Sequence, residues 1–274
     1  MDIPRPRLIA SDLDGTLLAG DGQLSDRTVE ALRAADEAGI AVVAATGRSH
    51  RTAGPRLEPA PVVRTAVCSN GATVFDTGSA TIVRHRTIDD EAVADVLAAV
   101  RSAHPDARFA WETSGGFGWE QAFVDLAPPH VGADIRNGNR AHEVHERIDD
   151  VAPTNLIKLL VGHPSLVELE WLRVLEPVLP GDLSVSTSGA AFVEVTGPGV
   201  DKASTLALVC DDLGIGAGDV LAFGDHANDV AMLEWAGTAC APANARSVAL
   251  DVADHVVGHH DEDGVAVAIE SVLA

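Results

Sequence analysis

The chain has 274 residues, 46% of them hydrophobic, which is enough for one large or two smaller globular domains. Its formal net charge of -22 argues against nucleic-acid binding, which needs clustered Lys and Arg. The three cysteines (Cys68, Cys210 and Cys240) are scattered along the chain, which is typical of buried thiols in a protein from a reducing compartment. No apolar stretch is long enough for a signal peptide or a membrane span. We therefore expect a cytoplasmic protein without nucleic-acid or membrane partners.

The first predicted element is a short buried strand that ends in two carboxylates. Residues 8–11 form an apolar run, and Asp12 and Asp14 follow it directly, where a turn begins. Open α/β sheets place their ligand crevice at the carboxyl ends of such strands. A single Asp in this position is more often a turn or helix cap, but the pair indicates a functional site.

A helix and two further strands follow in alternation. Residues 25–39 begin with a capping Ser, carry apolar residues at helical spacing and stop at Gly, and residues 40–45 form a second buried strand. Strand, helix, strand in this order implies a right-handed parallel crossover. A third run, 65–69, ends in Asn70 and Gly71, which either line the site or only form a turn before a hairpin over 72–84.

From about residue 87 the pattern changes, which predicts a second α+β unit over residues 87–187, inserted into a core formed by 1–86 and 188–274. A Gly-rich turn over 114–118 could select a leaving group through Glu112, Trp119 or Glu120, although ordinary structural roles are the favoured explanation of these residues. The expected elements are a helix (89–103), a strand (107–112), a poorly periodic stretch to about 150, a strand (155–161), a helix (165–175) and a strand (183–187).

The last part of the chain returns to alternating strands and helices, with helices over 202–213 and 229–236, short strands near 238 and 255, and a final helix from 264. The strand ending at Phe223 is followed by Gly224 and Asp225, and then by Asn228 and Asp229. The predicted fold class is therefore α/β: a doubly wound, mostly parallel Rossmann-like core sheet with an inserted α+β cap domain. Crowding four Asp carboxylates at one sheet edge is costly without a hard divalent cation.

Four short motifs in this order resemble the haloacid dehalogenase superfamily, and more narrowly its Cof-like, type IIB capped sugar-phosphate phosphatases. They are Asp12-Leu-Asp-Gly-Thr, Thr46-Gly-Arg, Gly199-Val-Asp-Lys and Gly224-Asp-x-x-Asn-Asp. The resemblance implies a Mg2+-dependent phosphomonoester hydrolase that acts on a small phosphorylated metabolite, such as a sugar phosphate or a phosphorylated cofactor. It also implies an aspartyl-phosphate intermediate.

The same resemblance implies a role for each matching residue. Asp12 is the expected nucleophile, and Asp14 is the expected general acid, which must carry a proton and so should be buried or lie near other carboxylates. Mg2+ would bind the side chains of Asp12 and Asp225 and the backbone carbonyl of Asp14. Phosphate would be bound by Thr46, Gly47, Lys202 and Asn228. Asp229 would support Lys202 or a metal-bound water. Arg48 would either contact the substrate or have a purely structural role.

Alternative functions remain open on the sequence alone. A phosphomutase of the same superfamily would return the phosphoryl group to a sugar, but the inserted block lacks a visibly basic surface for a second phosphate. A receiver-type signalling domain or a non-catalytic phospho-ligand binder is less consistent with the length and with the Asp12 and Asp14 pair. None of the eleven histidines has a Cys/His metal spacing, and His259 and His260 are expected at the surface.

Overall fold

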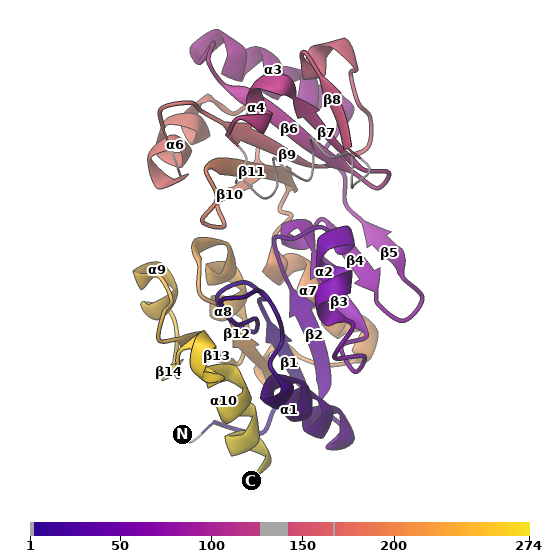
Figure 1. Ribbon diagram of the computed structural model, residues 1–274, viewed down its shortest axis with the longest axis vertical. Coiled ribbons are helices and arrows are strands. Elements are labelled where there is room, and N and C mark those ends of the chain that lie inside the picture. Colours follow the sequence, from indigo (N-terminus) through magenta and orange to yellow (C-terminus); the bar gives the residue numbers. More distant parts are fainter. Residues whose placement is uncertain (1–2, 127–141, 167) are drawn as a thin grey trace. The chain divides into compact units, whose positions relative to one another are not determined.

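The computed structural model describes residues 3–126, 142–166 and 168–274, which divide into two compact units (Figure 1). The core unit comprises Met1–His85 and Asp201–Ala274, and the inserted unit comprises Arg86–Val200. The predicted insertion starts next to this boundary but ends at residue 187 rather than 200. The difference arises because the strand Phe192–Pro198 pairs within the sheet of the inserted unit.

The core unit contains an eight-stranded sheet in the order β14-β13-β12-β1-β2-β3-β4-β5. The pairs from β14 to β3 are parallel, and β4 and β5 continue the sheet as an antiparallel hairpin. The strands are β1 (Leu8–Ser11), β2 (Ala41–Ala45), β3 (Thr65–Cys68), β4 (Thr73–Asp76), β5 (Thr81–His85), β12 (Val220–Phe223), β13 (Thr238–Pro242) and β14 (His255–Val257).

Strand β1 lies in the middle of this sheet because all four of its side chains are apolar or small and all are buried. Ile9 packs into one hydrophobic cluster, whereas Leu8 and Ala10 pack into another on the opposite face. Ser11 pairs with Phe223 of β12, so the residues after both strands emerge at the same sheet edge. This register places Asp12 beside the loop that contains Asp225.

Helices cover both faces of the core sheet, which confirms the predicted doubly wound α/β class. One cluster holds residues of α1, α2 and α10, and the other holds residues of α7, α8 and α9. Cys68, Cys210 and Cys240 are buried, as predicted. The helices are α1 (Asp26–Glu37), α2 (His50–Leu57), α7 (Lys202–Leu213), α8 (Val230–Trp235), α9 (Ser247–Leu250) and α10 (Gly264–Leu273). Each helix among the described residues is too short or too polar to cross a membrane.

The inserted unit is built on a six-stranded sheet in the order β10-β11-β9-β6-β7-β8, in which only β7 and β8 pair in parallel. Its core includes the fully buried Trp171 and Phe109. Part of the predicted poorly periodic stretch, residues 127–141, lies outside the described residues. The elements are α3 (Asp90–Ala103), β6 (Arg108–Thr113), β7 (Phe117–Glu120), α4 (Gln121–Val124), β8 (His142–His145), β9 (Leu156–Gly162), α6 (Glu168–Leu175), β10 (Leu183–Ser186) and β11 (Phe192–Pro198).

Candidate active site

A buried lysine joins two carboxylates at the edge of the core sheet. Lys202, the first residue of α7, is fully buried, and its Nζ donates to Asp12 Oδ1 and Asp229 Oδ1, both at 2.6 Å. The cost of burying an ammonium group at the positive end of a helix is offset by these two charged partners, which also raise the pKa of Lys202 against the effect of burial. Lys202 therefore remains charged and fixes the orientation of Asp12.

Asp229 also holds the loop that follows β12. Its Oδ2 accepts hydrogen bonds from the backbone N–H groups of Asp225 and His226, both at 3.0 Å. A Cβ on Gly224 would lie 2.5 Å from the Asp229 Cβ, so only glycine allows this close approach. The Gly-Asp-x-x-Asn-Asp segment thus forms a loop that is held in shape by its own hydrogen bonds and that presents Asp225 and Asn228.

The loop after β1 fits closely against Asp225. Thr16 Oγ1 donates to Asp225 Oδ1 at 3.0 Å. Gly15 has a φ of 76°, and a Cβ at this position would lie 2.6 Å from Asp225 Oδ2. Two segments more than 200 residues apart in the chain are therefore in direct contact, and the Asp12 and Asp225 carboxylates meet between them.

The charges of this cluster do not balance. Asp12, Asp225 and Asp229 each offer an oxygen atom within 4.8 Å of the others, whereas Lys202 is the one cation that contacts them among the described residues. Burial is the main cause that raises the pKa of Asp12, and the neighbouring Asp229, Asp225 and Asp14 add to it against the opposing effect of Lys202. The pKa of Asp225 is raised for the same reason, with Asp229 as the next cause.

This imbalance fits a hard divalent cation. The ligand atoms are all carboxylate oxygens, which Mg2+ prefers. Asp229 uses Oδ1 for Lys202 and Oδ2 for the loop amides, so it is placed to orient the site rather than to bind the ion directly. Lys202 donates a hydrogen bond to Oδ1 of Asp12, and Thr16 donates one to Oδ1 of Asp225. The Oδ2 atoms of Asp12 and Asp225 are thus left to bind a metal.

Asp14 has surroundings that differ from the expectation for a general acid. Its side chain is 51% exposed rather than buried, and it forms a two-pronged ion pair with Arg48, with Nε to Oδ2 at 2.6 Å and Nη2 to Oδ1 at 2.5 Å. Arg48 is thus placed at the site by a direct contact with Asp14, which the sequence did not reveal. The side chain of Arg48 is 27% exposed.

The loops after β2 and β3 form the other side of the site. The backbone N–H of Asn70 donates to the Thr46 carbonyl at 3.1 Å, and Asn228 Nδ2 donates to Asn70 Oδ1 at 3.0 Å. A Cβ on Gly47 would lie 2.9 Å from the same Asn70 oxygen. Asn70 therefore forms the turn between β3 and β4 and also contacts Asn228, one of the expected phosphate-binding residues.

The structure adds Asn244, which the sequence analysis missed. Its Nδ2 donates to the Gly15 carbonyl at 2.7 Å, and its Oδ1 accepts from the His260 backbone N–H at 3.0 Å. The available signal was its position just after a buried apolar strand, β13, that lies next to β12 in the sheet. Asn244 braces the loop that carries Asp12 and Asp14.

Two of the three candidates in the inserted unit, Trp119 and Glu120, have partners within that unit. The Glu120 carboxylate pairs with Arg101 and accepts hydrogen bonds from the backbone N–H groups of Phe109 and Ile148. Trp119 packs in a hydrophobic cluster and donates to His142 Nδ1 at 2.8 Å. Glu112 is fully buried in β6, opposite Lys158 of β9.

Comparison with known proteins identifies the family. A family model described as haloacid dehalogenase-like hydrolase matches residues 9–269. The Bacillus subtilis 5-amino-6-(5-phospho-D-ribitylamino)uracil phosphatase YcsE is 28% identical over 96% of this chain and 94% of its own length. The Escherichia coli pyridoxal phosphate phosphatase YbhA is 27% identical over 97% of this chain and 98% of its own.

Solved structures agree with this result. A haloacid dehalogenase-like hydrolase from B. subtilis superposes with a TM-score of 0.82 at 27% identity, over 96% of this chain and 99% of that one. A Streptococcus mutans protein shares the fold with a TM-score of 0.84 at 21% identity, over 98% of this chain and 99% of the other. The chain therefore belongs to the haloacid dehalogenase-like hydrolases, and it is a phosphatase of that family.

Proposed function

We propose that the chain is a Mg2+-dependent phosphatase that hydrolyses phosphomonoesters of small metabolites through a phosphorylated Asp12. The observation that carries this proposal is the buried contact of Lys202 with Asp12 beside Asp225 and Asp229. Relatives whose names specify phosphorylated metabolites, a ribitylaminouracil phosphate and pyridoxal phosphate, support this class of substrate, of which sugar phosphates and phosphorylated cofactors are the members we favour.

Asp12 is the group best placed to attack phosphorus. Lys202 donates to its Oδ1, which fixes the orientation of the carboxylate, and the carboxylate needs no base to become nucleophilic. Asp12, Asp225 and the backbone carbonyl of Asp14 would hold Mg2+, which when bound neutralises the charge of the phosphate and of the surrounding carboxylates.

The phosphate oxygens require further donors. The hydroxyl of Thr46, the backbone N–H of Gly47 and the side-chain amide of Asn228 come from loops that contact one another through Asn70. Because these donors are fixed before substrate binds, little reorganisation is needed when charge builds up on the phosphoryl group. The site thus supplies the positioning and charge neutralisation on which phosphoryl transfer depends.

Asp14 and Arg48 form the side of the site that faces the leaving group in this proposal. Their ion pair engages both oxygens of the Asp14 carboxylate, so neither oxygen is available to a leaving group. A phosphate group offers the guanidinium a competing two-pronged partner, so substrate binding draws Arg48 from Asp14 and frees the carboxyl group to act as acid and then as base.

The experiment that tests this function measures phosphate release from a panel of phosphorylated metabolites, with Mg2+ and with excess chelator. We expect turnover only with the metal, and we expect acid-quenched enzyme to carry one phosphoryl group on the peptide that contains Asp12, as detected by mass spectrometry. Asp12→Asn should reduce kcat by more than about a thousandfold while leaving the circular dichroism spectrum unchanged. Substantial turnover by Asp12→Asn would contradict the assignment.

A further inference from the structure

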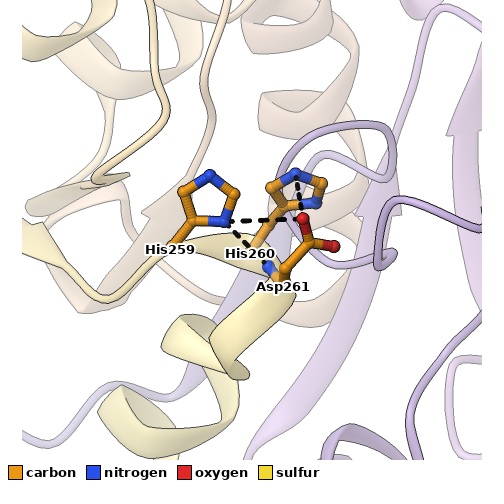
Figure 2. A group of neighbouring side chains, drawn as sticks. All are labelled: His259, His260 and Asp261. Carbon is orange, nitrogen blue, oxygen red and sulfur yellow. Dashed lines mark hydrogen bonds and ion pairs between the residues drawn. The ribbon is translucent and has the colours of Figure 1, made fainter.

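A second cluster of potential ligands lies in the core unit, in the turn just before α10. His259, His260 and Asp261 are consecutive in the chain, and the turn points their side chains toward one another (Figure 2). His259 Nδ1 and His260 Nε2 each lie 3.7 Å from Asp261 Oδ2. These three residues offer ligand atoms that all lie within 4.8 Å of one another.

The hydrogen bonds of this cluster assign its protons. The Leu18 carbonyl, 2.8 Å from His260 Nδ1, can only accept, so Nδ1 is the donor of this pair and Nε2 is the nitrogen that can present a lone pair to a metal. The backbone N–H of Asp261 donates to His259 Nδ1 at 3.1 Å, so that nitrogen also presents a lone pair. Asp261 Oδ1 accepts from the Gly20 N–H at 2.6 Å, and its Oδ2 lies toward the two rings.

Three potential electron-pair donors thus converge, because His259 Nδ1 and His260 Nε2 both face Asp261 Oδ2. The separation of 3.7 Å is too long for a direct hydrogen bond. A cation placed among the three donors would bind all of them. Two imidazole nitrogens and one carboxylate oxygen suit Zn2+ and similar transition ions, whereas Mg2+ favours oxygen ligands alone.

The surroundings resemble the support that metal ligands receive in proteins. A ligating histidine usually donates its other ring N–H to a carbonyl or carboxylate, as His260 does to Leu18. The side chain of His260 is only 15% exposed, so it is less superficial than the sequence suggested, while His259 and Asp261 are 40% and 52% exposed. Water can therefore complete the coordination on the open side.

We propose that His259, His260 and Asp261 form a binding site for Zn2+ or a similar transition-metal ion, separate from the acidic site around Asp12. Coordination replaces the hydrogen bond from the Asp261 N–H to His259 Nδ1 with a bond from that nitrogen to the metal. Because His260 and Asp261 are bonded to Leu18 and Gly20, the ion ties the turn before α10 to the loop that continues from Asp14.

The test is calorimetric titration of Zn2+ into the full chain in excess Mg2+, which occupies the acidic site. We expect about one Zn2+ per chain, and a loss of affinity of at least about tenfold in both His260→Asn and His259→Asn. The exposed His85 provides a matched control, since His85→Asn should bind Zn2+ as the wild type does. Zn2+ should also raise the melting temperature of the wild type and not of the two variants.

Three results would overturn the proposal: absence of Zn2+ uptake, uptake that persists in both histidine variants, or uptake that disappears in Asp225→Asn but survives in His260→Asn. Circular dichroism without Zn2+ shows whether each variant is folded. Should His260→Asn fail to fold because it loses the hydrogen bond to Leu18, His259→Asn decides, since among the described residues the His259 ring contacts only its neighbours His260 and Asp261. Failure of this proposal leaves the proposed phosphatase mechanism unaffected, because the readout is binding rather than turnover.

Discussion

Both units of the molecule bury carboxylates, but they satisfy them differently. In the inserted unit, the single carboxylate of Glu120 receives an ion pair from Arg101 and two backbone hydrogen bonds, at 2.9 Å and 3.0 Å. In the core unit, Asp12 and Asp229 share one lysine, and Asp225 lies beside them. The first arrangement is complete by itself, whereas the second has more negative charge than its partners neutralise.

The difference indicates which buried charges hold the fold and which serve chemistry. A carboxylate that is hydrogen-bonded through both oxygens stabilises a single conformation, as Glu120 does for the segments that contain Phe109 and Ile148. A cluster short of positive charge costs folding free energy and is retained where a ligand supplies the missing charge.

Replacing Lys202 by Met should have the largest effect, because it removes the cation shared by Asp12 and Asp229. We expect kcat to fall by more than about a thousandfold, and the free energy of unfolding to fall by about 3 to 5 kcal/mol, since two buried carboxylates lose their partner. Phosphate-release kinetics and urea denaturation measure the two effects. A variant that keeps near wild-type kcat would show that the Lys202 contact is structural, as in the inserted unit.

Replacing Glu120 by Gln should affect stability without affecting chemistry. The uncharged amide cannot form an ion pair with Arg101, so we expect the free energy of unfolding to fall by about 2 to 3 kcal/mol. We expect kcat to remain within about twofold of the wild-type value. Arg101→Met provides the matched control from the other side of the pair. If either variant lost kcat while keeping its stability, Glu120 would belong to the catalytic machinery after all.

The stabilisation by Mg2+ should grow as pH rises. Burial raises the pKa of Asp12 and Asp225, so their protonated forms favour the folded state at low pH, and this contribution is lost as pH rises through the raised values. The metal binds the charged carboxylates and offsets that loss. Melting temperatures measured with Mg2+ and with chelator should therefore diverge above the ordinary range of a carboxyl group, and less so in Asp225→Asn. A metal-induced shift that is independent of pH would contradict this view.

The smallest effect is expected for Asn244, which contacts the catalytic loop only through the Gly15 carbonyl. Asn244→Ala should lower kcat by about tenfold with little change in KM, because a small displacement of the loop misaligns the nucleophile. Asn244→Asp separates the two bonds of this residue: it still accepts from the His260 N–H but cannot donate to Gly15. Equal kcat for Asn244→Asp and the wild type would exclude the positioning role.

Much of the fold could be predicted because its strands are short apolar runs. Asp12 and Asp225 each follow such a run, and parallel pairing brings the ends of adjacent strands to one edge. The start of α7 at Lys202 was also predictable from the capping Asp201 and the apolar spacing that follows. These are local patterns, and the topology of a parallel sheet converts them into a shared site.

Other features depend on contacts that no local pattern encodes. Helix α2 was not predicted because its eight residues include Gly54 and Pro55, which disfavour a helix interior. Strand β11 was missed as part of the inserted sheet because Gly197 and Pro198 mark its end like a turn. The pairing of Arg48 with Asp14 joins two loops of the core and follows only from their packing.

The hydrogen bonds that assemble the proposed active site join residues far apart in the chain, with separations of 190 residues for Lys202 with Asp12, 209 for Thr16 with Asp225 and 229 for Asn244 with Gly15. During synthesis, β1 emerges first but cannot pair with β12 until most of the polypeptide has been made. The carboxylates therefore stay apart and hydrated in the nascent chain, where they do not repel one another. Catalytic competence appears only when β12 has paired with β1 and the loop that follows β12 is in place, which makes turnover a stringent reporter of completed folding.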